Sequence, residues 1–112
     1  MNPKQRNELM EGYTQELRRG VIVMAVLSQL DELDYGYSLI TRLAELDFEV
    51  DQGTLYPLLR RLEERGLLES EWVLGESRPR RYYKISPAGE QVLVELKKEW
   101  DALVQTMQKV IK

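Results

Sequence analysis

The stretch DQGTLYPLLRRLEERG, residues 51–66, has the pattern of a short helix with both of its ends marked. Asp51 can accept hydrogen bonds from the first backbone N–H groups, which have no partner inside a helix. Gly66 can close the other end in the left-handed conformation that residues with a side chain resist. Leucines recur three and four residues apart and form one buried stripe, namely Leu55, Leu58, Leu59 and Leu62.

The opposite side of this helix is polar. It carries amide, hydroxyl, phenol and guanidinium groups, contributed by Gln52, Thr54, Tyr56, Arg60 and Arg61. Such groups can meet phosphates and base edges in the major groove of DNA, although an ordinary amphipathic surface helix would have the same pattern. Pro57 removes one backbone donor and can bend the helix. Tyr56 is therefore expected either to project towards a nucleic acid or to lie half-buried at a tolerated kink.

The composition of the 112-residue chain narrows the possible functions. Apolar residues make up 43% and charged residues 31%, which fits one domain with a modest core. The absence of cysteine and histidine removes thiol nucleophiles, His-based triads, disulfides and the commonest zinc ligands. The chain also lacks a phosphate-cradling glycine loop. We therefore expect no enzyme, no metal and no cofactor.

The N-terminus has no apolar run of the signal-peptide kind, and the longest apolar run, residues 21–27, is too short to span a bilayer. We therefore expect a cytoplasmic protein. The formal net charge is −3, but the charges are unevenly placed. Residues 31–51 hold seven acids and one base, whereas residues 78–84 hold four bases and no acid. A concentrated basic segment can bind DNA even in an acidic chain.

Two helical segments are predicted before residue 51. Residues 1–13 are polar without clear periodicity, and we expect a loose arm or a short polar helix there. Residues 14–30 are apolar on nearly all sides of a helix, which predicts burial against the core and against a second subunit. A helix over residues 35–46 then leads through the connector 47–50 into the polar-faced helix. Two short helices joined by a brief turn are typical of a helix-turn-helix.

After Gly66 the apolar period changes to two. Residues 68–74 read as a half-buried strand, with Leu68, Trp72 and Leu74 on one side, and residues 80–85 read as its partner across a turn. A hairpin directly after a helix-turn-helix is typical of the wing of a winged helix. Its tip is basic and can lie along phosphates or enter a minor groove, unless it is simply a solvated turn; the bases are Arg78, Arg80 and Arg81.

The final segment is predicted to be a long helix that needs a partner. Ser86 can cap it and Pro87 suits its first position. Its apolar residues form a heptad seam, namely Leu93, Leu96, Trp100, Leu103, Met107 and Val110. We expect this seam, together with Val21 and Met24, to form a homodimer interface; packing within one chain is the alternative. The fold class expected is mainly α with a small β-hairpin (α+β), a winged helix-turn-helix with an added C-terminal dimerisation helix.

Three motifs resemble those of the PadR-like transcriptional regulators, namely Tyr35-Gly36-Tyr37, Gly53-Thr54-Leu55-Tyr56-Pro57-Leu58-Leu59 and Arg81-Tyr82-Tyr83. The resemblance covers residues 17–100, and the single C-terminal helix looks like the smaller subgroup. It implies a homodimeric winged-helix protein, usually a repressor, with ligands sometimes bound near the dimer interface. It also implies backbone contacts from Tyr37 and an aromatic Trp100 facing the subunit interface. Two carboxylates near the expected phosphates, Asp51 and Glu76, depart from the family pattern.

Three functional hypotheses follow. The first is a dimer that binds double-stranded DNA and reads an inverted repeat with helices about 34 Å apart. The second adds a small aromatic or hydrophobic effector in a cavity formed by Met24, Trp100, Leu103 and Met107, although Trp100 would equally fill a dimer core. The third is a winged-helix module that binds protein, not DNA, through the acidic residues 31–51. We divide the chain into an N-terminal arm (1–13), a winged helix-turn-helix domain (14–85) and a dimerisation helix (86–112).

Overall fold

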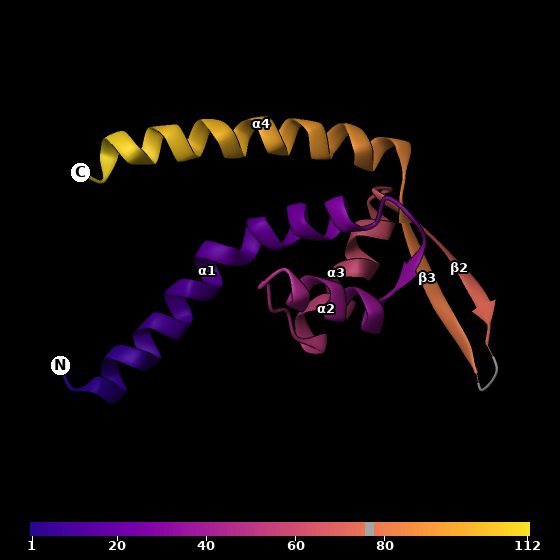
Figure 1. The fold of residues 1–112 in the computed structure, drawn as a ribbon, viewed down its shortest axis with the longest axis horizontal. Helices are drawn as coiled ribbons and strands as arrows, with labels where there is room; N and C mark the ends of the chain where they lie inside the picture. The colour runs from indigo at the N-terminus through magenta and orange to yellow at the C-terminus, as the bar shows by residue number, and fades with distance from the viewer. Residues whose placement is uncertain (76–77) are drawn as a thin grey trace.

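The computed structural model describes residues 1–75 and 78–112; Glu76, expected in the wing, lies outside them. The elements follow one another as α1 (Pro3–Gln29), β1 (Asp34–Tyr35), α2 (Gly36–Glu45), α3 (Gln52–Glu64), β2 (Leu68–Leu74), β3 (Pro79–Ile85) and α4 (Pro87–Val110) (Figure 1). The mainly α architecture with a small antiparallel sheet is the predicted one. Within the described part of the chain, no helix has both the length and the apolarity to cross a membrane.

Helix α1 begins eleven residues earlier than predicted. We expected residues 1–13 to be an arm or a separate polar helix, but they form the first turns of one continuous helix. The start is fixed by a capping box: the Gln5 N–H donates to Asn2 Oδ1 at 2.8 Å, and the Asn2 N–H donates to Gln5 Oε1 at 3.0 Å. Pro3 occupies the first turn, where its missing N–H costs nothing. The local signal for this start was present in the sequence.

Both helices of the helix-turn-helix end in the same way. Gly66 has a φ of 78° after α3, as predicted, and Asp47 has a φ of 63° after α2. After α3, the Leu67 N–H donates to the Leu62 carbonyl at 2.9 Å and the Gly66 N–H donates to the Glu63 carbonyl at 2.9 Å. This is a Schellman motif, which satisfies the last carbonyls of a helix. The sharp ends let α2, its connector and α3 fold within a short stretch of chain.

The sheet has three strands in the order β1-β3-β2, one more than predicted. The added strand β1 pairs with β3 antiparallel, with Asp34 opposite Tyr83 and Tyr35 opposite Tyr82. Asp34 also accepts a hydrogen bond from the Ser38 hydroxyl at 3.0 Å, which ties the strand to the first turn of α2. A strand of two residues has no periodicity of its own, and its pairing is with a distant segment.

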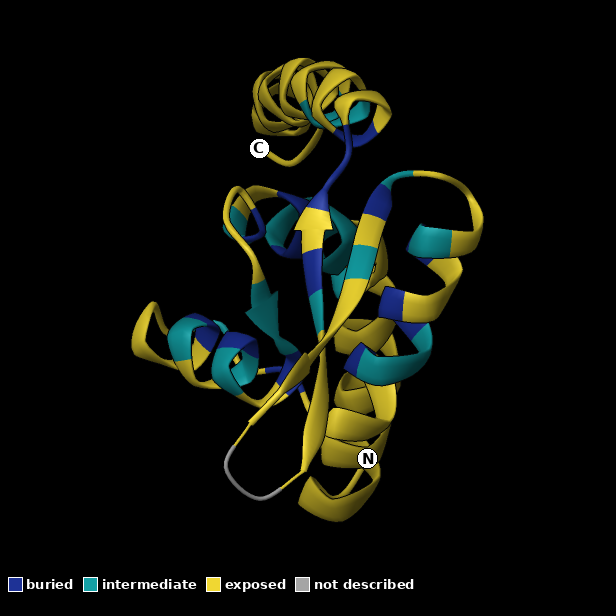
Figure 2. Ribbon diagram, turned by 90° about the vertical axis from the view of Figure 1, so that its right-hand side faces the viewer, coloured by how far each residue is buried: buried dark blue, intermediate teal, exposed yellow. Residues whose placement is uncertain are grey.

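The hydrophobic core lies where α1, α2, α3 and the inner end of the hairpin meet (Figure 2). Its largest fully buried side chains are Val26, Leu27, Leu30, Leu39, Leu55 and Leu59. The four leucines predicted on the back of α3 are all buried. The expectation of a half-buried β2 is wrong for its outer half, because Trp72 is 63% and Leu74 is 82% exposed. The hairpin extends beyond the core, so alternation in its outer half does not correspond to burial.

The junction between β3 and α4 is tightly built. Ser86 caps α4 as predicted: its Oγ accepts from the Gly89 N–H at 3.0 Å and its hydroxyl donates to the Gly66 carbonyl at 2.6 Å. The Ser86 N–H donates to the Leu67 carbonyl at 3.0 Å. From this joint α4 runs beside the C-terminal half of α1 and packs against it (Figure 1).

Candidate nucleic-acid interface

A groove of about 880 Å³ lies between the start of α2, helix α3 and the wing. It brings together most of the residues predicted to contact DNA, namely Tyr37, Gln52, Tyr56, Arg60, Arg78, Arg80 and Arg81. These residues come from three elements that are separated in sequence, and the fold places them along one surface. Phenol, amide and guanidinium groups side by side can both neutralise phosphates and meet base edges.

The remaining two predicted residues, Thr54 and Arg61, lie on the other side of α3. They line a second groove, of about 380 Å³, together with Arg18 and Arg19 of α1. The exposed part of α3 therefore forms a ridge flanked by two grooves, one on the wing side and one on the α1 side. A ridge of this form fits between the two phosphate backbones that border a major groove.

The start of α3 differs in detail from the prediction. Asp51 occupies the N-cap position, but its side chain makes no capping hydrogen bond; instead its carbonyl accepts from the N–H groups of Thr54 at 3.2 Å and Leu55 at 3.0 Å. The Thr54 hydroxyl beside the carboxylate lowers the pKa of Asp51 below its ordinary value. A charged carboxylate thus stands at the tip of the ridge, next to the expected phosphates.

Tyr56 is half-buried and also lines the groove. Its ring packs against Gly36: a side chain at position 36 would place its Cβ 2.1 Å from Tyr56 Cε1. Gly36 therefore allows α2 and α3 to approach each other at the floor of the groove. Tyr37 next to it is exposed, so its phenol is free to reach outwards.

The three wing arginines have different surroundings. Arg78 is exposed. The guanidinium of Arg80 lies 4.5 Å from the centre of the Tyr35 ring, which in turn lies 5.2 Å from the ring of Tyr82. Arg81 forms an ion pair with Glu63 of α3, with 2.8 Å between Nη2 and Oε1. Of the three arginines predicted at the wing tip, Arg81 is therefore paired with an acid of α3, although its side chain stays exposed.

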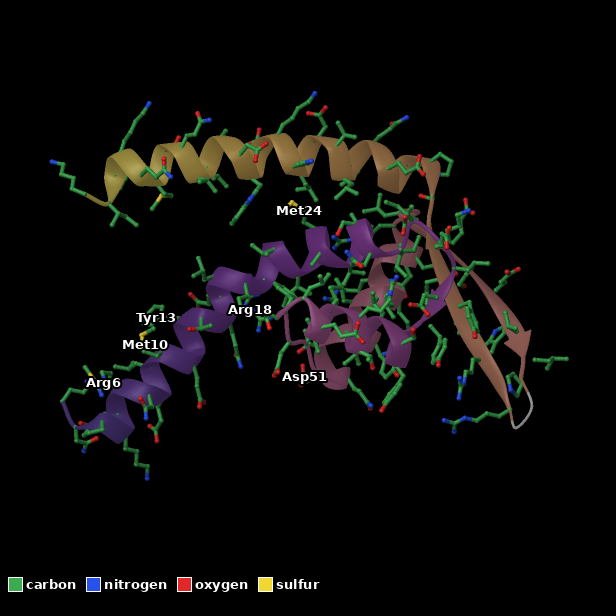
Figure 3. All side chains as sticks on the ribbon, viewed as in Figure 1. Arg6, Met10, Tyr13, Arg18, Met24 and Asp51 are labelled. Atoms are coloured by element: carbon green, nitrogen blue, oxygen red, sulfur yellow. The ribbon has the colours of Figure 1, made fainter. Side chains whose placement is uncertain are left out.

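A separate apolar cavity of about 810 Å³ lies between α1 and α4. It is lined by all four residues predicted to form an effector site, Met24, Trp100, Leu103 and Met107, and by Val21 and Leu96 of the predicted dimer interface. Met24 points from α1 towards α4 (Figure 3). The other two predicted interface residues lie outside it: Leu93 packs against the core, and Val110 near the end of α4 is exposed.

Two features of α1 were not predicted from the sequence. Arg18 donates to the Glu49 carbonyl at 2.5 Å and lies 4.6 Å from the centre of the Phe48 ring, so it anchors the connector between α2 and α3 (Figure 3). The first half of α1 also carries an exposed apolar stripe, Leu9, Met10, Tyr13 and Leu17. Spacings of three and four residues in that stripe were a signal for a helix with a partner.

A helix-turn-helix followed by a hairpin wing, with arginines and polar groups lining the space between them, defines a winged-helix DNA-binding protein. The comparisons with known proteins agree. Residues 23–95 match the model of the Transcriptional regulator PadR-like family, and the chain belongs to that family. It is a family of transcriptional regulators and not of enzymes.

Individual relatives cover most of the chain. Transcriptional regulator Rv3488 of Mycobacterium tuberculosis (strain ATCC 25618 / H37Rv) is 35% identical over 91 residues, which are 80% of this chain and 85% of the relative. The crystal structure of a PadR family transcriptional regulator from Eggerthella lenta DSM 2243 is 43% identical, covers 97% of both chains and has a TM-score of 0.90. A PadR-like transcriptional regulator from Bacillus cereus strain ATCC 14579 is 30% identical, with 87% and 97% of the two chains covered and a TM-score of 0.73.

Proposed function

We propose that the protein is a homodimeric, sequence-specific DNA-binding regulator that acts as a repressor. The observation that carries the proposal is the groove on the wing side of α3, where Gln52, Tyr56 and Arg60 face Arg78 and Arg80. In this proposal α3 enters the major groove, the wing arginines contact phosphates, and two copies read an inverted repeat about one helical turn apart. Arg61 and Thr54 contact DNA from the opposite side of the α3 ridge.

Dimerisation is proposed because too much apolar surface remains exposed for a lone chain. Along α4, Leu103 is 54% and Met107 is 42% exposed, and along α1 Leu17 is 79% exposed. Contiguous apolar surface of this kind marks an interaction site. A second copy, related by a two-fold axis, would cover the same faces on both chains. We propose that residues 14–85 form the DNA-binding domain and residues 86–112 the dimerisation helix, with Val21 and Met24 of α1 adding to the interface. The proposed site of action is the cytoplasm.

Replacing Arg60 by alanine is expected to weaken binding to a duplex from the protein's own promoter region about tenfold to a hundredfold, because an exposed guanidinium that lines the groove is lost. Replacing Arg80 is expected to reduce the slope of log Kd against log salt by about 0.9, the value for one neutralised phosphate. Electrophoretic shift and fluorescence anisotropy at several KCl concentrations measure both quantities.

The control is Arg65→Ala, which removes an exposed arginine from the C-terminal end of the same helix, outside the groove. It should bind as the unchanged protein does. If the protein shows no shift of its promoter duplex even in low salt, the DNA-binding proposal fails. The alternative, a winged-helix module that binds protein through the acidic residues 31–51, would then be preferred.

We further propose that a planar aromatic or hydrophobic effector occupies the cavity between α1 and α4 and relieves repression. Residues 17–24 of α1 line both sites. Leu17, Val21 and Met24 line this cavity, whereas Arg18 and Arg19, on the other face of the helix, line the groove beside α3. One helix thus lies between the cavity and the connector that precedes α3. A ligand that prefers one spacing of the two α3 helices would change DNA affinity.

Trp100 provides the readout for the effector. In a Trp72→Phe background it is the remaining tryptophan, and a bound aromatic ligand should shift or quench its emission. A panel of planar aromatic compounds is titrated, and Met24→Ala is expected to reduce affinity for any compound that responds. No response across a broad panel would favour the other role of Trp100, filling the dimer core.

A further inference from the structure

The outer half of the wing stands away from the hydrophobic core. Leu68 is the one buried residue of β2, and Tyr83 and Ile85 are the buried residues of β3, all at the inner end of the hairpin. The added strand β1 stops at Tyr35, whose partner on β3 is Tyr82. Beyond that pair, the path of the wing depends on the pairing of β2 with β3 and on contacts that reach α3.

Two polar contacts join the wing to α3, and a third links the two strands of the wing to each other. Arg81 on β3 donates through Nη2 to Glu63 Oε1 at 2.8 Å and through Nε to Ser70 Oγ at 3.0 Å. The Ser70 hydroxyl on β2 donates in turn to the other carboxylate oxygen, Glu63 Oε2. Both oxygens of one carboxylate on α3 are therefore used, one by each strand of the wing. A closed set of charge-assisted contacts of this kind fixes direction as well as distance.

The same contacts leave Arg81 poorly suited to bind a phosphate. Its guanidinium lies 5.6 Å from the centre of the Trp72 ring and 5.9 Å from that of Tyr83. Its charge is already balanced by Glu63, so a phosphate would have to compete with that carboxylate. Arg78 and Arg80, by contrast, have no carboxylate partner among the described residues.

We propose that Arg81, through Glu63 and Ser70, sets the angle between the wing and α3, and that it is a positioning residue and not a phosphate contact. This inference rests on the proposed DNA binding and replaces the phosphate role that the sequence predicted for Arg81. The wing arginines at positions 78 and 80 reach the DNA backbone only if the hairpin is held at the right angle to the helix in the major groove.

The test uses substitutions for which the change in charge alone would predict a different effect on DNA affinity from the one that we expect. Glu63→Ala removes a negative charge near DNA, yet it should weaken binding to the promoter duplex about fivefold, the effect of losing one partly exposed ion pair. Arg81→Lys keeps the positive charge but cannot make both contacts, and it should weaken binding similarly. Neither should change the salt slope, and the double variant Glu63→Ala with Arg81→Ala should be no weaker than either single one.

The matched control is Glu64→Ala, which removes the neighbouring exposed acid of α3 and should bind as well as the unchanged protein or better. The proposal is overturned if Glu63→Ala tightens binding as Glu64→Ala does, while Arg81→Lys binds normally and Arg81→Ala lowers the salt slope by about 0.9. Thermal melts of all variants identify any that fail to fold.

A second readout needs no DNA and separates this inference from the proposed function. In a Trp100→Phe background, Trp72 on the wing is the remaining tryptophan, and its fluorescence anisotropy reports how freely the wing moves. Glu63→Ala should lower that anisotropy, although Glu63 belongs to α3, and Glu64→Ala should not. If the unchanged protein fails to bind DNA, the proposed function fails; if the anisotropy of Trp72 is the same in all variants, the positioning role of Arg81 fails.

Discussion

Gly89→Ala is expected to lower the free energy of unfolding by about 3 kcal/mol, because the joint between β3 and α4 has no room for a methyl group. A Cβ at position 89 would lie 2.1 Å from the Leu67 carbonyl oxygen and 2.7 Å from Ile85 Cγ1. That carbonyl already accepts the Ser86 N–H, so the backbone cannot move away without breaking this hydrogen bond. The melting temperature should fall by roughly 12 °C, measured by circular dichroism.

The matched control for this substitution is Gly12→Ala. Gly12 lies in the interior of α1, where an added Cβ would meet nothing within 4 Å. Alanine there should stabilise the protein by about 1 kcal/mol, because glycine is the poorer helix former. If Gly89→Ala has the same melting temperature as the unchanged protein, the close packing described for the joint between β3 and α4 is wrong.

Leu103→Glu is expected to convert the protein from a dimer to single subunits. In a two-fold dimer the substitution places two carboxylates in one apolar interface, and an unpaired buried charge is strongly unfavourable. The dimer dissociation constant should rise at least about a hundredfold, which corresponds to roughly 3 kcal/mol. Sedimentation at micromolar concentration measures the change, and affinity for the promoter duplex should fall with it.

Gln105→Glu is the control for Leu103→Glu. Residue 105 is exposed and does not line the cavity between α1 and α4, so the same added charge should leave the dimer intact. An unchanged protein that sediments as one subunit at micromolar concentration would contradict the dimer proposal outright. If the Leu103→Glu protein stays dimeric, the dimer interface must be assigned to another surface, namely the exposed apolar stripe at the start of α1.

Local patterns in the sequence predicted most of the architecture. Three features are each determined by a few neighbouring residues, and all three are present: the leucine stripe of α3, the left-handed Gly66 and the Ser86 cap. The early start of α1 was also local, in the Asn2 capping box, but no buried stripe follows it to draw attention to it. Signals of this kind can be found by looking at one turn of helix at a time.

Features that depend on distant partners could not be predicted in this way. Strand β1 exists because Asp34 and Tyr35 lie beside β3, and nothing in those two residues indicates the pairing. The ion pair of Arg81 depends on Glu63, which belongs to another element. The residues lining the groove were predicted individually, from helix faces and from a family resemblance, but their division between two sides of α3 required the fold.

The contact between Gly36 and Tyr56 has a consequence for how this protein can evolve. The tyrosine ring occupies the volume that any side chain at position 36 would need, so the two positions share one fixed space. A larger residue at 36 requires the ring at 56 to shift or to be exchanged for something smaller. Because Tyr56 is also part of the surface proposed to read DNA, a change at position 36 is expected to alter operator preference as well, although residue 36 itself lies beneath that ring.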